Sequence, residues 1–529
     1  MESIRRQGTD RGSRGFHTPS HQGGQLIIKD DPSRLLVGAK RALLINPPIY
    51  DSQYWARWSQ PHGLLKVATW LRGQGYDQLR LLDFLATDQN RKVQFKRRDK
   101  IQRDDIARHF YEFGWPLKKL QSELERHVRG DLFRPEEIWI TFIMTYWWES
   151  TRDVIRLVHQ VFDPPRPRIL VGGIYPTLDP KHADGILSSE SDEVIIVPGE
   201  ICDDAANAWT DLSLYNDPIY DAHPSYAIIT GSRGCPFNCN YCAQLKLNDG
   251  CRTVRYRDPE DVAEEIVQKQ QDHKIREIAF YEDNLLFNQD NFLARLDAIE
   301  RRGLKLEIYA PEGIEPRLIE YELLSRMRRA GFSRIHLALE TIDNEIGRGW
   351  NRRQATIEKF DQAVRIAQEC GFQVGAQDLN AFVIFGLPGE DLQAVVNTAI
   401  YASHRVGSVV PMLFTPVPSS ILFEQNHQYL MEKMGWDLHQ LNGKLLPFLE
   451  YNRQNYPELR ASDYLELEAF MTRLNSSKVS KKRFNIEGKS LKGTIPTMNI
   501  KVRQLCQKLV SKVKEKGTCL IHQLEKCKC

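Results

Sequence analysis

The sequence predicts an α/β protein with a doubly wound N-terminal domain, a partial barrel of six β/α units and a helical C-terminal region. Three observations predict it. At 529 residues the chain exceeds what a single hydrophobic core holds. Apolar strand-like runs alternate with helical patterns, which is typical of parallel sheets covered on both faces. The alternation restarts near residue 226 and becomes irregular from about 430.

The composition is that of an ordinary globular protein, with 41% hydrophobic and 27% charged residues. The formal net charge of +3 does not indicate a nucleic acid or a membrane as an obligatory partner. No apolar run approaches the length that crosses a bilayer. The first residues carry basic groups but lack the apolar core of a secretory signal, so we expect a cytoplasmic protein.

Residues 1–38 are rich in Gly, Ser, Arg, Gln and His, and we expect them to be disordered. The doubly wound domain follows at 39–215. Its expected strands are 41–48, 79–85, 138–144, 168–173 and 193–200, with helices at 62–76 and 150–162. The charged stretch from 90 to 135 is predicted to be a helical insertion.

The barrel is expected over 216–428. Its strand candidates are 226–235, 277–283, 304–310, 334–340, 379–386 and 409–415, with helices such as 258–271 and 354–370 between them. Six units fall short of the eight in a closed barrel, so an open partial barrel is predicted. Residues 429–477 are then a helical region, and 478–529 a basic tail.

Three cysteines follow the first barrel strand in GSRGCPFNCNYCAQ, namely Cys235, Cys239 and Cys242. Three thiolates on one loop are one ligand short of a closed zinc site. They suit a [4Fe–4S] cube whose fourth iron stays open to a small molecule. Gly231 and Gly234 let the backbone wrap tightly around it. The alternatives are a zinc knuckle with a distant fourth ligand and three unrelated thiols.

This spacing resembles the signature of the radical S-adenosylmethionine (SAM) superfamily. The resemblance implies that SAM chelates the open iron. One electron from the cluster then splits SAM and yields a 5′-deoxyadenosyl radical. The resemblance also implies an electron donor such as flavodoxin or ferredoxin. Tyr241 stands where the family places an aromatic residue near the adenine.

The ends of the later strands extend the resemblance. After the second barrel strand, Tyr281, Glu282, Asp283 and the following Asn284 stand where the family needs acceptors for the SAM ammonium group. An ammonium has three donors and no acceptor, which requires carboxylates or carbonyls there. Taken singly, each acidic residue would be better explained as a solvated cap.

Three further segments match the family in order. Glu340 and Thr341 correspond to its acidic and hydroxyl pair near the ribose, and Arg353 to a partner of the SAM carboxylate. Gly386, in FGLPGED, would allow close approach to the adenine. TPVPSS (415–420) replaces the usual Pro-x-Pro-Gly-Thr with two serines at its end.

The segments LLINPP, GLLKVATWLRGQGY, LLD, VGGIYPT and VPGE resemble the Rossmann-like cobalamin-binding domain that precedes the barrel in one radical SAM class. Most lie at carboxyl ends of strands, where such sheets bind ligands. The resemblance implies cobalamin contacts at Thr145, Gly172, Gly173, Thr177 and Glu200.

The domain lacks the Asp-x-His-x-x-Gly motif that supplies a histidine to cobalt in other cobalamin proteins. The alternative is a scaffold of the same fold that binds no cobalamin and acts as a substrate lid. Nearby, Tyr146, Trp147 and Trp148 would either wall the cobalt or the substrate, or pack between domains.

The tail 478–529 holds fourteen Lys or Arg against three Glu, a local charge of +11. Cys506, Cys519, Cys527 and Cys529 would hold an auxiliary cluster, or the lysines would contact RNA phosphates. The simpler interpretation is a solvated, flexible end.

The favoured activity is cobalamin-dependent methylation of an unactivated carbon of a small molecule that the sequence does not identify. The first alternative is a radical SAM oxidoreductase, cyclase or rearrangement enzyme without cobalamin. The second is a non-catalytic iron–sulfur protein that binds RNA through its tail. The residues favour neither nucleic acid nor membrane as a partner.

Overall fold

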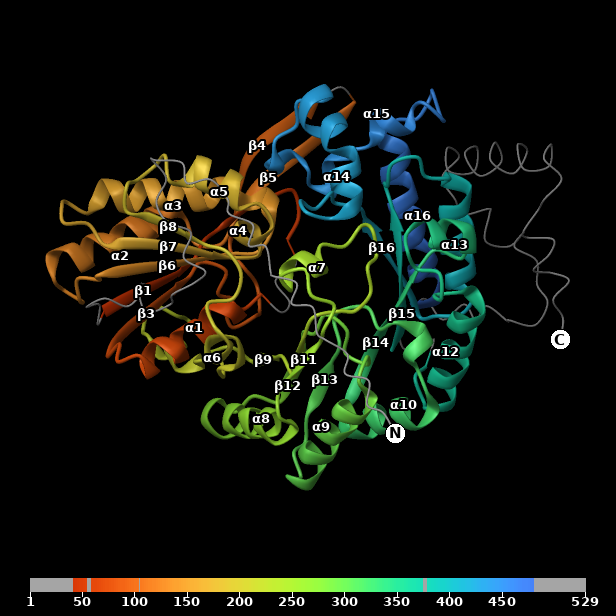
Figure 1. Cartoon of the computed structure of the whole chain (residues 1–529), viewed down its shortest axis with the longest axis horizontal. Helices are drawn as coiled ribbons and strands as arrows, with labels where there is room; N and C mark the ends of the chain where they lie inside the picture. The colour runs from red at the N-terminus through yellow and green to blue at the C-terminus, as the bar shows by residue number, and fades with distance from the viewer. Residues whose placement is uncertain (1–40, 55–58, 104, 374–377, 480–529) are drawn as a thin grey trace, which may run out of the picture.

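The computed structural model describes residues 41–54, 59–103, 105–373 and 378–479. The expectations for residues 1–38, and those for nearly all of the basic tail with its four cysteines, lie outside the described residues. Two lobes stand side by side, one from the red-to-yellow part of the chain and one from the green-to-cyan part (Figure 1).

Five parallel strands form the sheet of the first lobe, in the order β3-β1-β6-β7-β8. They are β1 (Arg41–Asn46), β3 (Gln78–Asp83), β6 (Glu137–Phe142), β7 (Arg168–Gly173) and β8 (Val194–Val197). Along the chain this order is second, first, third, fourth, fifth, so its direction reverses between β1 and β6. That reversal is the switch point of a doubly wound sheet, where ligands bind.

The helices of this lobe follow its strands. They are α1 (His62–Gly73), α2 (Leu117–Arg129), α3 (Trp148–Val161), α4 (Ile174–Leu178), α5 (Pro180–Leu187) and α6 (Asp203–Asn207). Crossovers between parallel strands are right-handed, and those through α1 and α3 run in opposite directions along the sheet. The two helices therefore cover opposite faces, and the predicted fold class is confirmed.

The charged stretch from 90 to 135 departs from the expected helical insertion. It begins with a hairpin of β4 (Phe95–Arg103) and β5 (Ile106–Phe113), and only α2 is helical. The hairpin pairs with β2 (Ile49–Asp51) in a second, antiparallel sheet. Strand β4 has almost no buried side chains, so backbone pairing rather than an apolar pattern determines its conformation.

Six parallel strands form the curved sheet of the second lobe, in the order β16-β15-β14-β13-β12-β9. They are β9 (Tyr226–Ile229), β12 (Glu277–Phe280), β13 (Glu307–Tyr309), β14 (Phe332–Glu340), β15 (Leu379–Phe385) and β16 (Ser408–Leu413). A short ribbon of β10 (Ser232–Arg233) and β11 (Arg255–Tyr256) follows β9. The sheet runs in chain order without closing, which confirms the open six-stranded barrel.

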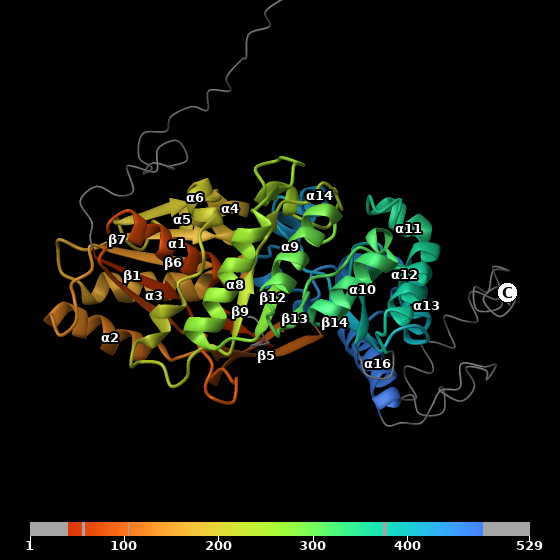
Figure 2. The same cartoon turned by 90° about the horizontal axis from the view of Figure 1, so that it is seen from below.

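Helices cover the outside of this sheet, as Figure 2 shows from below. They are α8 (Pro259–His273), α9 (Gln289–Arg301), α10 (Tyr321–Ala330), α12 (Ile357–Glu369) and α13 (Leu392–Ser403). Two short helices, α7 (Gln244–Leu247) and α11 (Asn344–Gly349), follow the cysteine loop and β14, and α7 contacts α4 of the first lobe. Helix α8 illustrates why they begin where they do. Asp258 accepts hydrogen bonds from the first free amides, and Pro259 occupies the first helical position.

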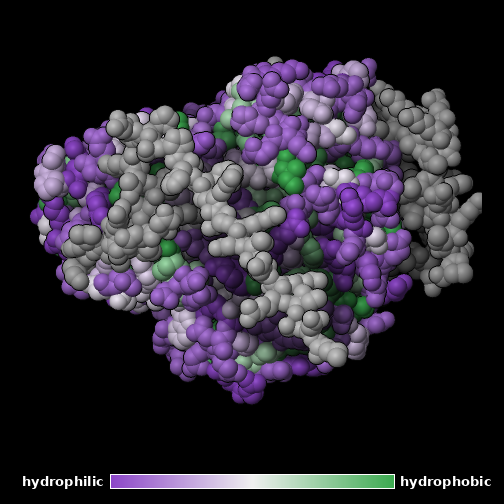
Figure 3. Space-filling view, viewed as in Figure 1, coloured by the Kyte–Doolittle hydropathy of each residue, from purple (hydrophilic) through white to green (hydrophobic). Residues whose placement is uncertain are grey.

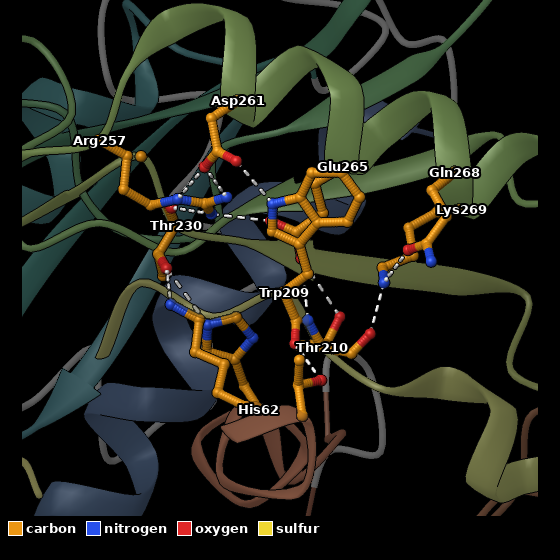
Figure 4. A network of polar contacts seen from close by, with 12 residues as sticks. His62, Trp209, Thr210, Thr230, Arg257, Asp261, Glu265, Gln268 and Lys269 are labelled. Atoms are coloured by element: carbon orange, nitrogen blue, oxygen red, sulfur yellow. Dashed lines mark hydrogen bonds and ion pairs between the residues drawn. The ribbon is translucent and has the colours of Figure 1, made fainter. Parts of the chain in front are cut away.

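A network of buried polar side chains joins the two lobes (Figure 4). The Lys66 ammonium on α1 donates to Thr230 Oγ1 at the end of β9, at 2.8 Å. On α8, Glu265 accepts from the Thr210 amide at 3.0 Å, and Lys269 donates to the Thr210 carbonyl. These side chains are at most 6% exposed. The lobes therefore share a buried polar joint.

The C-terminal region packs on both lobes. Its helices are α14 (Ile421–His427), α15 (Leu449–Asn452) and α16 (Ala461–Val479), and α16 lies along β16. Among the described residues, no helix has the length and apolar content needed to cross a membrane. The face seen in Figure 3 is mostly hydrophilic, with small scattered hydrophobic patches.

Candidate active site

The cysteine loop lies at the carboxyl end of β9, where the barrel opens. Cys235 and Cys239 are partly buried, Cys242 is exposed, and all three are free thiols. Gly234 has a φ of +102°, and a Cβ there would lie 2.7 Å from the Thr253 carbonyl oxygen. The glycine is therefore required by the neighbouring backbone, as well as by the tight turn.

The surroundings of the three thiols suit a bound cluster. The Asn284 side-chain amide lies 3.7 Å from the Cys235 sulfur, and the Gln244 amide donates to the Cys242 sulfur at 3.4 Å. Burial raises the pKa of the Cys235 and Cys239 thiols. Hydrogen bonds to sulfur tune iron–sulfur clusters.

Among the described residues, no three His, Cys, Asp or Glu side chains converge on a single ion. In a [4Fe–4S] cube each cysteine binds a different iron, so the three sulfurs do not need to converge on one ion. The three cysteines therefore remain the residues that would hold a cluster.

Glu282, predicted to accept the SAM ammonium, has a different role in the structure. It is 3% exposed and forms an ion pair with Arg295, itself fully buried. Its oxygens also accept from the Gly231 amide, at 3.0 Å, and from the Ser232 hydroxyl. Both oxygens of Glu282 are thus engaged within the protein, where they support the start of the cysteine loop.

Asp283 is the acceptor of this segment that remains near the loop. Its carboxylate accepts from the Gly234 amide at 2.6 Å and lies 3.4 Å from the Arg233 guanidinium. Burial raises the pKa of Asp283 and also that of Tyr281. The structure thus separates two neighbouring acids into one that supports the loop and one that faces the site.

Glu340 and Thr341 line a pocket together with the GLPGE segment. Its other lining residues include Trp350, Leu387 and Glu390. Glu340 has a φ of +63°, a left-handed conformation unusual for a glutamate at the end of a strand. Such strain gathers at functional sites, and here it accompanies a register shift between β14 and β15. The predicted ribose pair and the fifth-strand motif therefore meet.

Gly386 adjoins this pocket with a φ of +87°. Its amide donates to the Glu390 carboxylate at 2.7 Å, and a Cβ would lie 3.4 Å from Leu413. The left-handed conformation, rather than lack of space, is what requires a glycine here.

The arginine near the site is Arg352, not the predicted Arg353, which is exposed. Arg352 is 7% exposed and donates to the Ala338 carbonyl at 2.6 Å and to the Tyr241 hydroxyl at 3.3 Å. It also pairs with Glu315 at 3.4 Å. Asn351 is left-handed, with a φ of +61°, and this turn directs Arg352 inward. Sequence spacing alone does not reveal such a turn.

Tyr241 is packed edge-on against Trp350, with 5.9 Å between ring centroids. Since Trp350 lines the pocket of Glu340, the predicted adenine-side aromatic residue is adjacent to the predicted ribose residues. In TPVPSS, Ser419 has a φ of +67°, so it keeps the conformation that favours the glycine it replaces.

In the first lobe, the predicted cobalamin residues lie at the carboxyl edge of the sheet. Thr145 is buried just after β6. Gly173 has a φ of +106°, and a Cβ would lie 2.3 Å from the Phe142 carbonyl oxygen. The neighbouring strand therefore leaves no room for any side chain at position 173. At Gly172 a Cβ would make only ordinary contact, 3.5 Å from the Val197 carbonyl oxygen.

Thr177 and Glu200 are engaged within the protein. The Thr177 hydroxyl donates to the Gly173 carbonyl and accepts from the Gly199 amide, both at 2.7 Å. It thus connects the loops after β7 and β8. Glu200 pairs with Arg233 and Arg255 of the second lobe. The sequence placed these residues at the correct edge but did not reveal these partners.

Two large apolar side chains are exposed at this edge, and sequence reasoning missed them. Met144 follows β6 and is 40% exposed, and Ile174 follows β7 and is 37% exposed. The two strands are neighbours, with Phe142 opposite Gly173. Adjacent exposed apolar groups at the edge of a doubly wound sheet are typical of a ligand site.

The aromatic run after β6 divides between two roles. The Trp147 indole donates to Asp51 at 2.8 Å, and the Trp148 indole to Asp437 at 2.9 Å. Asp437 belongs to the C-terminal region, so Trp148 packs between domains. Trp147 is hydrogen-bonded to Asp51, within the first lobe. Tyr146 is partly exposed and packs edge-on against Trp147.

Comparison with protein families identifies the second lobe. Residues 229–402 match the Radical SAM superfamily. The second lobe therefore contains a radical SAM domain.

Similar proteins carry different activities. The chain is 26% identical over 204 residues to an anaerobic magnesium-protoporphyrin IX monomethyl ester cyclase of Cereibacter sphaeroides, covering 38% of this chain and 32% of the relative. It is 21% identical over 243 residues to the cytidylyl-2-hydroxyethylphosphonate methyltransferase of Streptomyces wedmorensis, covering 43% and 44%. The match thus spans a third to under a half of these relatives.

A solved structure resembles both lobes together. It is the radical SAM methyltransferase TsrM of Kitasatospora setae with cobalamin and a [4Fe–4S] cluster bound. The TM-score is 0.51 at 15% identity, over 74% of this chain and 78% of that one. At this identity the likeness concerns the fold.

Proposed function

We propose that this protein is a cobalamin-dependent radical SAM methyltransferase that methylates a carbon of a small molecule. The observation that carries the proposal is the edge of the first sheet, where Met144 and Ile174 are exposed next to the radical SAM domain. Apolar groups suit the face of a macrocycle. The two-lobe likeness to TsrM, a cobalamin-binding methyltransferase, supports it.

Named residues of the second lobe would hold the cluster and SAM. Cys235, Cys239 and Cys242 bind the cluster, which supplies the electron that splits SAM. Asp283 accepts the SAM ammonium, since Glu282 is occupied by Arg295. We assign the SAM carboxylate to Arg352, since a buried guanidinium suits a carboxylate ligand.

The pocket beside Trp350 would take the nucleoside part of SAM. Glu340 and Thr341 offer acceptors to the ribose, and the backbone at Gly386 lies along the adenine. Tyr241 packs against Trp350 and closes this side. Together these residues orient SAM and keep water from it.

Residues of the first lobe would hold cobalamin, which supplies the methyl group. Met144 and Ile174 would offer the ring apolar contacts, and the missing side chain at Gly172 would leave space beside it. Thr145 lies at the same edge, whereas Thr177 and Glu200 hold the surrounding loops. Trp147 and Trp148 are bound to acids within the protein. Tyr146 is partly exposed at this edge and would contact cobalamin or the substrate.

Anaerobic reconstitution tests the proposal. The purified chain, supplied with iron, sulfide and hydroxocobalamin, should retain about four irons and about one cobalt after desalting. A variant with Cys235, Cys239 and Cys242 changed to Ala should lose the iron and keep the cobalt. Reduced enzyme with SAM should form 5′-deoxyadenosine, and with substrate also S-adenosylhomocysteine. Iron without cobalt would overturn the cobalamin assignment.

A second candidate is a radical SAM cyclase or oxidoreductase that works without cobalamin. The 26% identity to a cyclase, which exceeds the identity to the methyltransferase, favours a reaction other than methyl transfer. This candidate predicts 5′-deoxyadenosine without S-adenosylhomocysteine and without methylated product. The same assay therefore separates the two candidates. We propose flavodoxin or ferredoxin as the reductant in either case.

A further inference from the structure

Arg233 lies between two carboxylates that belong to different lobes. Its Nε is 3.4 Å from Glu200, in the loop after β8, and its Nη1 is 3.4 Å from Asp283, after β12. Glu200 belongs to the edge of the first sheet, and Asp283 to the barrel mouth. One guanidinium thus faces both proposed cofactor sites, two residues before Cys235.

A second arginine distinguishes the role of the first. In the ribbon of β10 and β11, Arg233 is directly opposite Arg255. Arg255 also binds Glu200, at 2.6 Å, and it contacts Asp203 and the Asn248 side-chain oxygen, each at 3.4 Å. Both arginines therefore hold the loop after β8, but Asp283 pairs with Arg233, at 3.4 Å, and not with Arg255.

Each acid partner of Arg233 lies in a segment held by further hydrogen bonds. Asp283 accepts from the Gly234 amide at 2.6 Å, so it is fixed to the cysteine loop. On the other side, the Gly199 amide donates to Thr177, whose hydroxyl donates to the Gly173 carbonyl at the end of β7. A continuous set of hydrogen bonds and ion pairs therefore links the end of β7 to the cysteine loop.

We propose that Arg233 is a positioning residue that couples cobalamin binding to SAM binding, by dividing its guanidinium between Glu200 and Asp283. This inference rests on the proposed function, because it needs both cofactors. A cofactor that orders the loop after β8 fixes Glu200, and Glu200 then retains Arg233. Asp283 is left available for the ammonium of SAM, which would otherwise compete with Arg233.

The expected effect is modest and reciprocal. The Arg233 side chain is 36% exposed and that of Glu200 is 29% exposed, so each ion pair is partly screened by water. Exposed pairs are worth a few tenths to about 1 kcal/mol, which corresponds to an affinity change of about threefold. Cobalamin should tighten SAM binding by about this factor, and SAM should tighten cobalamin binding equally.

Calorimetric titration of SAM into the cluster-loaded, unreduced enzyme, with and without hydroxocobalamin, measures the coupling. The wild type should bind SAM about threefold more tightly with cobalamin present. R233Q should bind SAM equally with and without it. R255Q is the matched control, since it removes an arginine from Glu200 but leaves the contact between Arg233 and Asp283, and it should keep the coupling.

E200Q tests the same link from the other lobe, away from the cysteine loop. It should also lose the coupling, and it settles the question if R233Q fails to hold its cluster. Unchanged coupling in R233Q or E200Q, or no coupling in the wild type, would overturn the role of Arg233 while cobalamin retention leaves the proposed function intact. Failure of the wild type to retain cobalamin would overturn both.

Discussion

At the scale of single residues, the site depends on which of two adjacent side chains turns inward. Arg352 and Arg353 have the same charge and side chain, yet only Arg352 is buried, among Tyr241, Ala338 and Glu315. The left-handed Asn351 causes this difference. A buried guanidinium that loses its charge leaves its acid partner uncompensated.

R352Q should therefore destabilise the protein by about 2 kcal/mol, because Glu315 then keeps only the weaker contact with Arg317 at 3.6 Å. R353Q, at an exposed position, should change stability by less than about 0.5 kcal/mol. Denaturant unfolding of the two variants and the wild type gives these values. Equal losses would show that Arg352 has no special role in the fold.

Glu390 makes stability depend on pH. It is 8% exposed, and burial raises its pKa to about 7 from the ordinary value of 4.5 for a glutamate. The native state therefore holds a proton that the unfolded chain releases. Its contribution is complete below about pH 4.5 and is lost as pH rises through 7.

E390Q should remove this dependence, since the amide does not titrate and its oxygen still accepts one of the hydrogen bonds that Gly386 and Tyr464 donate to Glu390. Relative to the wild type, E390Q should gain roughly 3 kcal/mol between pH 4.5 and 8. Unfolding midpoints across that range measure the change. D391N, at the exposed neighbouring cap of α13, should follow the wild type. Parallel curves for E390Q and wild type would contradict the prediction.

At the scale of elements, the hairpin of β4 and β5 shows where sequence patterns are insufficient. Strands β1, β6 and β15 were predictable because they contain continuous apolar runs. The exposed, charged β4 has no such run. Its partners are β5 and, through Arg103, the distant Met434 and Trp436, which local periodicity does not encode.

The same limit applies to the site. The cysteine loop and the strand-end acids were predictable, because parallel strands end at one edge and the motif fixes the spacing. The division of roles between Glu282 and Asp283 was not, since it depends on Arg295 on α9. Likewise, Glu200 was placed at the right edge, but its partners lie in the other lobe. Long-range ion pairs leave no local signal.

The hairpin also caps a distant helix, and this gives a prediction for the C-terminal region. Asp105 accepts from the amide of Ala461, the first residue of α16, at 2.8 Å and pairs with Arg453 at 3.0 Å. D105N should weaken this end by about 1 kcal/mol and speed amide exchange in the first turn of α16. D99N is the control, because Asp99 pairs only with neighbouring Arg98. Equal exchange in both variants would contradict the capping role.

At the scale of the whole molecule, the buried joint between the lobes makes the two domains one structural unit. Lys66, Arg257 and Lys269 are buried there with Glu265, which is fully buried. Glu265 accepts hydrogen bonds from the amide of Thr210, in the segment between the lobes, and from the Arg257 guanidinium, at 2.7 Å. Arg257 also pairs with the partly exposed Asp261 at 2.6 Å, so Glu265 is the fully buried acid of this cationic cluster and also holds the connecting segment.

E265Q should therefore lower stability by about 3 kcal/mol, because it leaves buried cations without their acid. The single calorimetric transition expected for the wild type should broaden or separate into two, as the lobes lose their joint. E264Q is the matched control, since Glu264 is the adjacent residue on α8. Its side chain is 55% exposed and pairs with Arg302. E264Q should therefore lower stability by less than about 0.5 kcal/mol. Scanning calorimetry of the full chain distinguishes these outcomes. If E265Q unfolded in one transition at the wild-type temperature, the polar joint would not be what holds the lobes together.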